Sequence, residues 1–298
     1  MELGVSLPTA GPLASPATIV PVAQEAERLG YAAVWTFERL LRPVADEQVP
    51  EAYQVVYDPL ETLAYVAAVT ERVKLGTSVV DALFHPPVVL ARRYATLDQF
   101  SGGRVIAGLG QGWMPQEFET ANVPVRRKGA GMDELIAAMR ACWAPDPVEY
   151  AGRFYRIARS EVGPKPAQAR LPILLGSVTP AGAQRAARIA DGLNPIAFAE
   201  DQLTGLLSVY RTAVAEAGRD PAELSVAVRA NVPITAKPLD RDRPYLGGSP
   251  EQIAEDLARL DAAGGVDQVL FNNMSARDLD ELLQPLAELP AAAAAAGS

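Results

Sequence analysis

The sequence contains very few of the residues on which metal and nucleophilic chemistry depend. Among its 298 residues there is one cysteine, Cys142, and one histidine, His85. A single cysteine forms no internal disulfide and no thiolate-rich metal site, and mechanisms that need two histidines are excluded. We therefore expect no metal centre, and zinc hydrolases of the HExxH type are ruled out.

Long hydrophobic runs and positive charge are also scarce. No stretch approaches the roughly 18 consecutive apolar residues of a membrane span, and Met1–Val5 lacks the basic start of a signal peptide. The 27 Lys and Arg stand against 36 Asp and Glu, a formal net charge of −9 that argues against general nucleic-acid binding. We expect a small-molecule partner, neither nucleic acid nor membrane, and a cytoplasmic location.

Strand and helix patterns alternate along the whole chain. The expected strands are 2–7, 33–35, 74–80, 104–109, 171–175, 192–196, 224–234 and 266–271. The expected helices are 18–29, 58–69, 86–97, 131–143, 180–190, 201–217, 249–263 and 276–286. Eight strand-then-helix units predict a (β/α)8 TIM barrel. The rival is an open doubly wound sheet, which usually carries a glycine fingerprint after its first strand, and this chain has none there.

We predict one barrel domain over residues 1–290 with small insertions. An insertion near 149–170 contains Glu149–Tyr155, where a glycine-centred turn lies between aromatic residues and favours a hairpin. A plain surface loop is the alternative. Residues 291–298 are mostly alanine, with no helix cap or apolar partner face, and are expected to form a frayed, flexible tail.

The residues that follow the strands indicate where the chemistry lies. Active sites of barrels are found at the carboxyl ends of the strands. Here those positions are rich in small residues, backbone donors and aromatics and poor in nucleophiles and bases, which suits a flat cofactor better than a hydrolytic triad. Three alternating glycines, Gly108, Gly110 and Gly112, end the fourth strand and allow either a ligand or a neighbouring backbone to come close.

The segment Gly176–Thr179 leads into a helix with Pro180 in its first turn. Free amide donors at a helix N-terminus, beside the hydroxyls of Ser177 and Thr179, form a candidate phosphate site. Simple N-capping by Thr179 is compatible with this interpretation.

Several motifs, none specific alone, combine into a pattern that runs from the first strand to the last. They are Asp58–Leu63, Thr70–Val79, His85–Arg92, Leu97–Arg104 and Gly108–Trp113, extended by 133–134, 150–155, 162–166, 172–176 and 188–192. The combination resembles the bacterial luciferase-like family. Within that family it is most similar to the oxidoreductases that use the deazaflavin coenzyme F420.

The resemblance implies a barrel with a deazaflavin lying across the carboxyl ends of the strands. It implies a non-proline cis peptide at Ser78–Val79 that supports the tricyclic ring, a ring-adjacent loop near Trp113, and a phosphate loop in which Ser177 replaces a glycine of many relatives. The implied cofactor-binding residues are Thr77, Ser78, Val79, Gly110, Gly112, Gly176, Ser177, Val178 and Thr179.

One departure from the family concerns the proton donor. Several relatives carry a histidine after the second strand, where this chain has Glu38 and Arg39. Arginine has a pKa above about 12 and is no general acid, but Arg39 can bind an anion or polarise a carbonyl. Glu38 and Glu117 are candidate proton relays, or else ion-pair partners of an arginine. The candidate catalytic residues are Glu38, Arg39, Trp113 and Glu117.

Two further segments have a structural and a functional interpretation. His85 lies before Pro86 at a helix start, where a loop or capping role is favoured over catalysis. The basic run Arg126–Lys128 is either a solvated face or a contact for the acidic tail of the cofactor.

Three functions remain open. The first is a homodimeric F420-dependent oxidoreductase that transfers a hydride to or from a small organic substrate. The second is a luciferase-like monooxygenase that uses reduced FMN from a separate flavin reductase, since the cofactor decides the reaction class. The third is a non-catalytic barrel that has lost cofactor binding.

Overall fold

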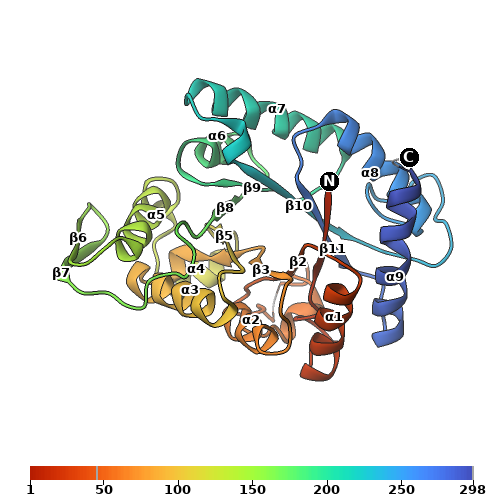
Figure 1. Ribbon diagram of the computed structural model, residues 1–298, viewed down its shortest axis with the longest axis horizontal. Coiled ribbons are helices and arrows are strands. Elements are labelled where there is room, and N and C mark those ends of the chain that lie inside the picture. Colours follow the sequence, from red (N-terminus) through yellow and green to blue (C-terminus); the bar gives the residue numbers. More distant parts are fainter. Residues whose placement is uncertain (45, 297–298) are drawn as a thin grey trace.

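The computed structural model describes residues 1–44 and 46–296. Parallel strands form a closed ring at its centre, with helices packed outside (Figure 1). The ring strands are β1 (Glu2–Ser6), β2 (Ala33–Thr36), β3 (Lys74–Thr77), β5 (Val105–Gly110), β8 (Ile173–Gly176), β9 (Gly192–Asn194), β10 (Ser225–Val232) and β11 (Gln268–Asn273). They pair in the order β3-β2-β1-β11-β10-β9-β8-β5, and pairing of β3 with β5 closes the ring. The predicted (β/α)8 barrel is confirmed.

The third expected strand, 74–80, is divided in two. β3 ends at Thr77, and β4 (Val80–Asp81) resumes beyond the Ser78–Val79 bond and pairs with the end of β5. Asp81 therefore belongs to a strand, one residue beyond the predicted end.

Each expected helix is present, most of them shifted by only a few residues. The helices are α1 (Pro16–Arg28), α2 (Pro59–Ala67), α3 (Pro87–Ser101), α4 (Pro115–Thr120), α5 (Ala130–Trp143), α6 (Pro180–Ile189), α7 (Glu200–Glu216), α8 (Pro250–Ala263) and α9 (Leu279–Ala296). Short 3₁₀ helices are η1 (Glu51–Gln54), η2 (Ala82–Phe84), η3 (Val125–Arg127) and η4 (Pro221–Glu223). Proline is the first residue in six of the nine α-helices of the described ranges, a position where its missing N–H costs no hydrogen bond.

Side chains fill the interior of the ring below the carboxyl ends of the strands. Trp35 is fully buried there, packs with Leu174 and Leu270, and donates its indole N–H to Gln268 at 2.8 Å. A Cβ on Gly76 would collide with the Trp35 ring, so this neighbouring position admits only glycine. A larger apolar core lies between the strands and the helices.

The hairpin insertion is confirmed. β6 (Val148–Ala151) and β7 (Arg156–Ser160) pair antiparallel and project beside α5 at the left edge of Figure 1. Glu134 of α5 accepts the backbone N–H groups of Arg153 (2.9 Å) and Phe154 (2.8 Å), which fixes the turn.

The expectation of a frayed alanine-rich tail is wrong as far as Ala296. α9 continues through Pro290 to that residue. Leu289 is buried and Ala293 packs against the core, so the last turns extend a docked helix, and alanine has the highest helix propensity. Residues 297–298 lie outside the described residues.

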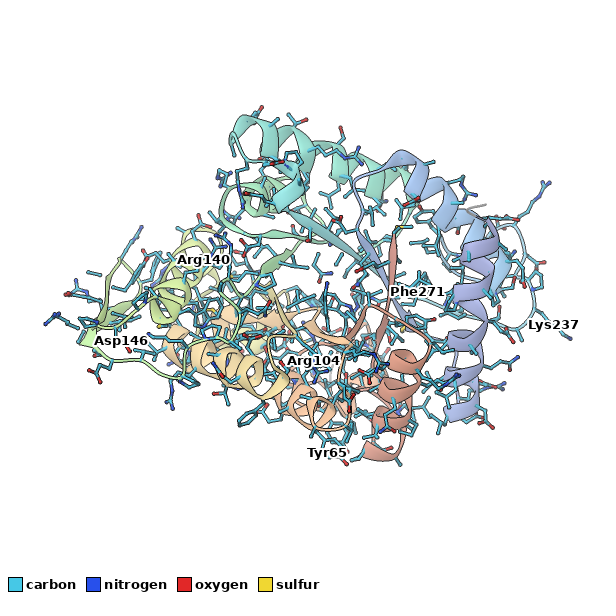
Figure 2. The ribbon with its side chains drawn as sticks, in the orientation of Figure 1. Tyr65, Arg104, Arg140, Asp146, Lys237 and Phe271 are labelled. Carbon is cyan, nitrogen blue, oxygen red and sulfur yellow. The ribbon has the colours of Figure 1, made fainter. Side chains whose placement is uncertain are left out.

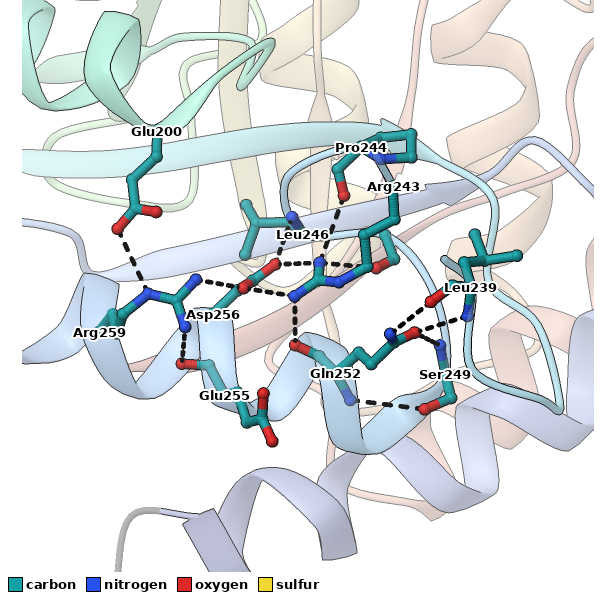
Figure 3. A network of polar contacts seen from close by, with 11 residues as sticks. Glu200, Leu239, Arg243, Pro244, Leu246, Ser249, Gln252, Glu255, Asp256 and Arg259 are labelled. Carbon is teal, nitrogen blue, oxygen red and sulfur yellow. Dashed lines mark hydrogen bonds and ion pairs between the residues drawn. The ribbon is translucent and has the colours of Figure 1, made fainter. Parts of the chain in front are cut away.

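A polar network fastens α8 to the segment that follows β10 (Figure 3). The carboxylate of Asp256 pairs with Arg243 at 2.5 and 2.7 Å and with Arg259 at 2.5 Å, and accepts the N–H of Leu246 at 2.8 Å. Burial favours a raised pKa for Asp256, but the hydrogen bonds from these three groups outweigh it, and the pKa is lowered. None of the helices in the described ranges combines the length and hydropathy needed to cross a bilayer.

Candidate active site

A cavity of about 420 Å³ opens at the carboxyl ends of the strands, within the size range of small-molecule sites. Most of the predicted site residues line it: Arg39, Ser78, Val79, Gly110, Gly112, Trp113, Gly176, Ser177, Val178 and Thr179. Glu38, Thr77 and Glu117 are buried behind its wall instead. The sequence therefore located the site but did not separate the residues that face it from those that support it.

Ser78 and Val79 both line the cavity, and the bond between them is cis, as the resemblance implied. Val79 fits between two predicted glycines. A Cβ on Gly110 would lie 2.5 Å from Val79 Cγ2, and one on Gly176 would lie 2.8 Å from Val79 Cγ1. Both positions therefore need glycine to make room for Val79. For Gly110, Val79 is the close neighbour that the alternating glycines predicted without identifying it.

Thr77 is a support and not a lining residue. Its hydroxyl donates to the carbonyl of Gly108 at 2.8 Å, accepts the Gly108 N–H at 2.9 Å and lies 2.8 Å from the hydroxyl of Tyr94. A Cβ on Gly108 would collide with the Thr77 carbonyl. These contacts close the ring between β3 and β5, which explains why Thr77 is turned away from the cavity.

Polar side chains from the far side of the ring hold Ser78 in place. Its hydroxyl donates to Asn194 Oδ1 at 2.7 Å, and the guanidinium of Arg229 donates to its carbonyl. Arg229 also donates to Asn231 at 2.8 Å and lies 4.8 Å from the centre of the Phe37 ring. Burial lowers the pKa of Arg229 to about 10, so it remains a cation at neutral pH.

Sequence reasoning missed Arg229, and its signal was weak. An arginine inside the apolar strand β10 lacks the glycine or loop context that marked the other positions. Only closure of the ring brings β10 opposite Ser78.

Arg39 is a buried cation shared by two carboxylates. Its guanidinium nitrogens lie 2.7 Å from Asp81 and 2.6 Å from Glu117, and the carboxylate of Glu117 also accepts the N–H of Leu40 at 2.7 Å. Burial raises the pKa of Glu117, against the attraction of Arg39. For Glu117 the structure shows the ion-pair partner that was the alternative to a proton relay. Arg39 also lies 5.7 Å from the Trp113 ring, at the edge of the cavity.

Glu38 pairs with the only histidine and not with an arginine. Glu38 Oε1 lies 2.8 Å from His85 Nε2, and Oε2 accepts the N–H of Asp81 at 2.8 Å. His85 thus has a side-chain partner in addition to its position before α3. The expectation of an arginine partner for Glu38 is wrong because Asp81 and Glu117 occupy Arg39.

Asp81 is the carboxylic acid that the sequence analysis missed. Among the described residues that line the cavity, it alone carries a carboxyl group. Burial raises the pKa of Asp81 to about 7; Arg39 opposes this shift, and Glu117 and Glu38 reinforce it. The signal was available, because Asp81 directly follows the apolar end of the third predicted strand. Asp81 is therefore the lining group that can gain or lose a proton near neutral pH.

The predicted phosphate loop is capped internally. Thr179 Oγ1 accepts the N–H of Gly182 at 3.2 Å, and Ser177 Oγ accepts the N–H of Thr179 at 3.1 Å. N-capping by Thr179 is confirmed, and phosphate binding stays a prediction. In the basic run, Lys128 lines the cavity, whereas Arg127 stacks on Phe154 and Tyr155 of the hairpin at 4.7 and 5.0 Å.

The described residues that line the cavity include the Ser78–Val79 bond, three glycines and one carboxylic acid. In the ranges 1–44 and 46–296, no three His, Cys, Asp or Glu side chains are arranged to hold a metal ion. The Ser78 hydroxyl donates a hydrogen bond to the side-chain amide of Asn194 and not to a base. The fold and site thus define a (β/α)8 barrel with a cavity at the carboxyl ends of its strands.

Comparison with known proteins assigns the family. The profile of the luciferase-like monooxygenase family matches residues 1–242, and the chain belongs to this family. The chain is 38% identical over 149 residues to an uncharacterized protein of Mycobacterium tuberculosis, covering 49% of this chain and 53% of that one. It is 30% identical over 183 residues to an F420-dependent glucose-6-phosphate dehydrogenase of Amycolatopsis mediterranei, covering 59% and 52%. The chain thus spans about half the length of these curated relatives.

A solved structure shares the whole fold. The monooxygenase RslO1 from Streptomyces bottropensis matches with a TM-score of 0.83 and 24% identity, over 100% of both chains. The family resemblance seen in the sequence is confirmed.

Proposed function

We propose that this protein is an oxidoreductase that uses coenzyme F420 and transfers a hydride between this cofactor and a small organic substrate. The observation that carries the proposal is the cavity of about 420 Å³, lined by the Ser78–Val79 bond and by Asp81. Its volume suits a small organic ligand, and among the described lining residues the Ser78 hydroxyl is hydrogen-bonded to an amide and not to a base. The F420-dependent relative supports this choice of cofactor.

The lining residues fit a deazaflavin with a phosphorylated tail. Val79 and Trp113 would contact the ring, and the segment Gly176–Thr179, at the N-terminus of α6, would bind the phosphate. When bound, the deazaflavin supplies the hydride donor or acceptor. The protein binds and orients both reactants and excludes water.

Asp81 is the group we assign to proton transfer. Reduction of a carbonyl needs a proton in addition to a hydride, and a general acid works best when its pKa is near the working pH. The carboxyl of Asp81 meets this condition, whereas Arg39 stays charged and positions Asp81 and Glu117. Glu38 lies behind the wall and supports the backbone of Asp81.

The decisive experiment is titration of the purified protein with F420 and with FMN, followed by cofactor fluorescence. We expect micromolar binding of F420 and none of FMN. Gly176→Asp places a carboxylate at the phosphate loop and should weaken F420 binding at least tenfold. Gly176→Ala measures the steric effect on Val79 alone, and Gly205→Asp, on an exposed part of α7 with open space around it, is the matched control.

A reduced-FMN monooxygenase is the second candidate, favoured by the similarity to RslO1. Tight binding of FMN alone would select it. Binding of neither cofactor would leave the third possibility, a non-catalytic barrel.

We also propose that the protein is a homodimer whose interface is the outer face of α2 and α3. Val89 and Phe100 are 48% and 73% exposed there and line the same groove. Glu61 and Arg92 lie on the same groove, so the face carries both signs of charge, as a self-complementary two-fold interface can. Sedimentation analysis of the Phe100→Arg and Phe198→Arg variants tests this proposal. The Phe100→Arg variant should be monomeric, and the Phe198→Arg variant should remain a dimer.

A further inference from the structure

A second pocket adjoins the main cavity. It has a volume of about 210 Å³ and shares four lining residues with the cavity: Phe37, Tyr53, Arg229 and Asn231. From there it extends past the end of β1 to α9. We call this space, between β1, β11, α1 and α9, the side pocket.

The far part of the side pocket is apolar. Its walls there are Leu7, Val22, Phe271, Leu282, Leu286 and Leu289. Phe271 lies on the flank of the barrel that α9 covers (Figure 2). An apolar cavity of about 150 Å³ is enough for a benzene-sized ligand, so the side pocket has room for a ring or a short alkyl chain.

Arg229 is the one charged residue among the described residues that line the side pocket, and it lies at the junction with the main cavity. The guanidinium donates to Asn231 and to the carbonyl of Ser78, and stacks on Phe37. The far part of the side pocket has no charged residue among its described lining residues, so burying a phosphate or carboxylate group there would be costly.

The junction of the two spaces offers neutral hydrogen-bonding groups. Asn272 Nδ2 donates to Asn231 Oδ1 at 3.2 Å. Within the described ranges, the amide nitrogen of Asn231 and the amide oxygen of Asn272 have no protein partner and can bind a ligand carbonyl or hydroxyl. Both residues line the side pocket, and Asn231 also lines the main cavity.

We propose that the side pocket binds the apolar part of an uncharged ketone or alcohol, whose oxygen lies at the junction beside Asn231. This inference rests on the proposed function, which places the reacting carbon in the main cavity. It predicts a substrate class different from that of the relative that acts on glucose 6-phosphate.

Calorimetry with a series from 2-butanone to 2-octanone tests the inference, with F420 binding measured separately by fluorescence. Each methylene buried is worth about 0.8 kcal/mol, so affinity should rise about fourfold per carbon until the pocket is full. Glucose 6-phosphate should bind at least 100-fold more weakly than 2-octanone. An affinity that does not change along the series, or stronger binding of the sugar phosphate, would overturn the proposal.

A pair of variants on α9 locates the binding site. Leu282→Trp fills the side pocket and should weaken 2-octanone binding at least tenfold, with F420 binding unchanged. Leu283→Trp is the control, because Leu283 is equally half-buried but does not line the pocket. Equal affinities of both variants would place the ketone elsewhere. The series in the unaltered protein gives an answer even if a variant fails to fold.

The two proposals fail in different ways. Loss of F420 and FMN binding with an intact chain-length series would refute the proposed function and leave the side pocket as a ligand site. Binding of F420 without the chain-length series would refute the side-pocket inference alone.

Discussion

Asp81 and Asp256 are both almost fully buried and both pair with arginine, yet their pKa values shift in opposite directions. Asp256 pairs with two arginines, of which Arg259 also contacts Glu200, and it accepts a backbone N–H. Asp81 shares Arg39 with Glu117 and lies near Glu38. Burial raises the pKa in both places, and the supply of positive charge decides the outcome. The α8 network therefore stabilises the fold, whereas the Arg39 cluster keeps a proton available in the cavity.

The largest effect is expected when the buried ion pair between Asp256 and Arg243 is broken. Asp256→Ala leaves Arg243 largely buried without its partner and should lower the free energy of unfolding by about 3–5 kcal/mol. Urea unfolding measures it. Glu255→Ala, at the exposed neighbouring position of α8, is the control and should change stability by less than about 0.5 kcal/mol. A small loss of unfolding free energy for Asp256→Ala would contradict the conclusion that the α8 network stabilises the fold.

The second prediction concerns Asp81→Asn. The pKa of Asp81 is raised in the folded state, so its contribution is most favourable at low pH and is lost as the pH rises from about 4 to about 7. Asparagine has no such dependence. At pH 4 the two proteins should be similarly stable, and by pH 8 the variant should be more stable, by about 1.4 kcal/mol per unit of pKa shift.

Urea unfolding at pH 4, 6 and 8 gives this comparison, with exposed Asp201→Asn as control. A constant difference across the three values would mean that Asp81 has an ordinary pKa. For Asp256, whose pKa is lowered, the sign is reversed: its stabilisation is present above its unfolded pKa of about 4 and is lost in acid.

A third, smaller effect separates the causes of the Asp81 shift. Glu117→Gln removes a neighbouring negative charge and leaves Arg39 to Asp81, so the pKa of Asp81 should fall below 7. The stability difference between this variant and Glu117→Gln/Asp81→Asn should therefore be smaller at pH 8 than the difference between the unaltered protein and Asp81→Asn, and it should stop growing below pH 7. An unchanged pH dependence would show that the charge of Glu117 does not contribute to the raised pKa of Asp81.

The smallest effect is expected for Arg259→Ala. This side chain is about half exposed, and Asp256 keeps Arg243, so the loss should be no more than about 1 kcal/mol. A loss as large as that of Asp256→Ala would mean that both arginines are needed, which would weaken the contrast with Asp81.

The fold was predictable from the sequence because its signals are local. Proline and capping residues marked the helix starts, and apolar runs marked the strands, so the main errors were at the ends of elements. The tail was misjudged because its helix depends on docking of Leu286 and Leu289, which composition does not reveal.

The candidate site was predictable in its position but only partly in its members. Glycines and hydroxyls after strands located the cavity. Arg229 lies within a strand pattern and Asp81 directly follows one. Both were missed because their roles depend on partners that are distant in sequence: Glu38 is 43 residues from Asp81, and Ser78 is 151 residues from Arg229.

The sequence by itself determined the barrel and the family, since these follow from periodicity and motifs. Only the tertiary structure decided which carboxyl group faces the cavity and carries a pKa near 7. The physical reason is that a pKa depends on burial and on charges brought together from separate strands, and neither is written in the local order of residues.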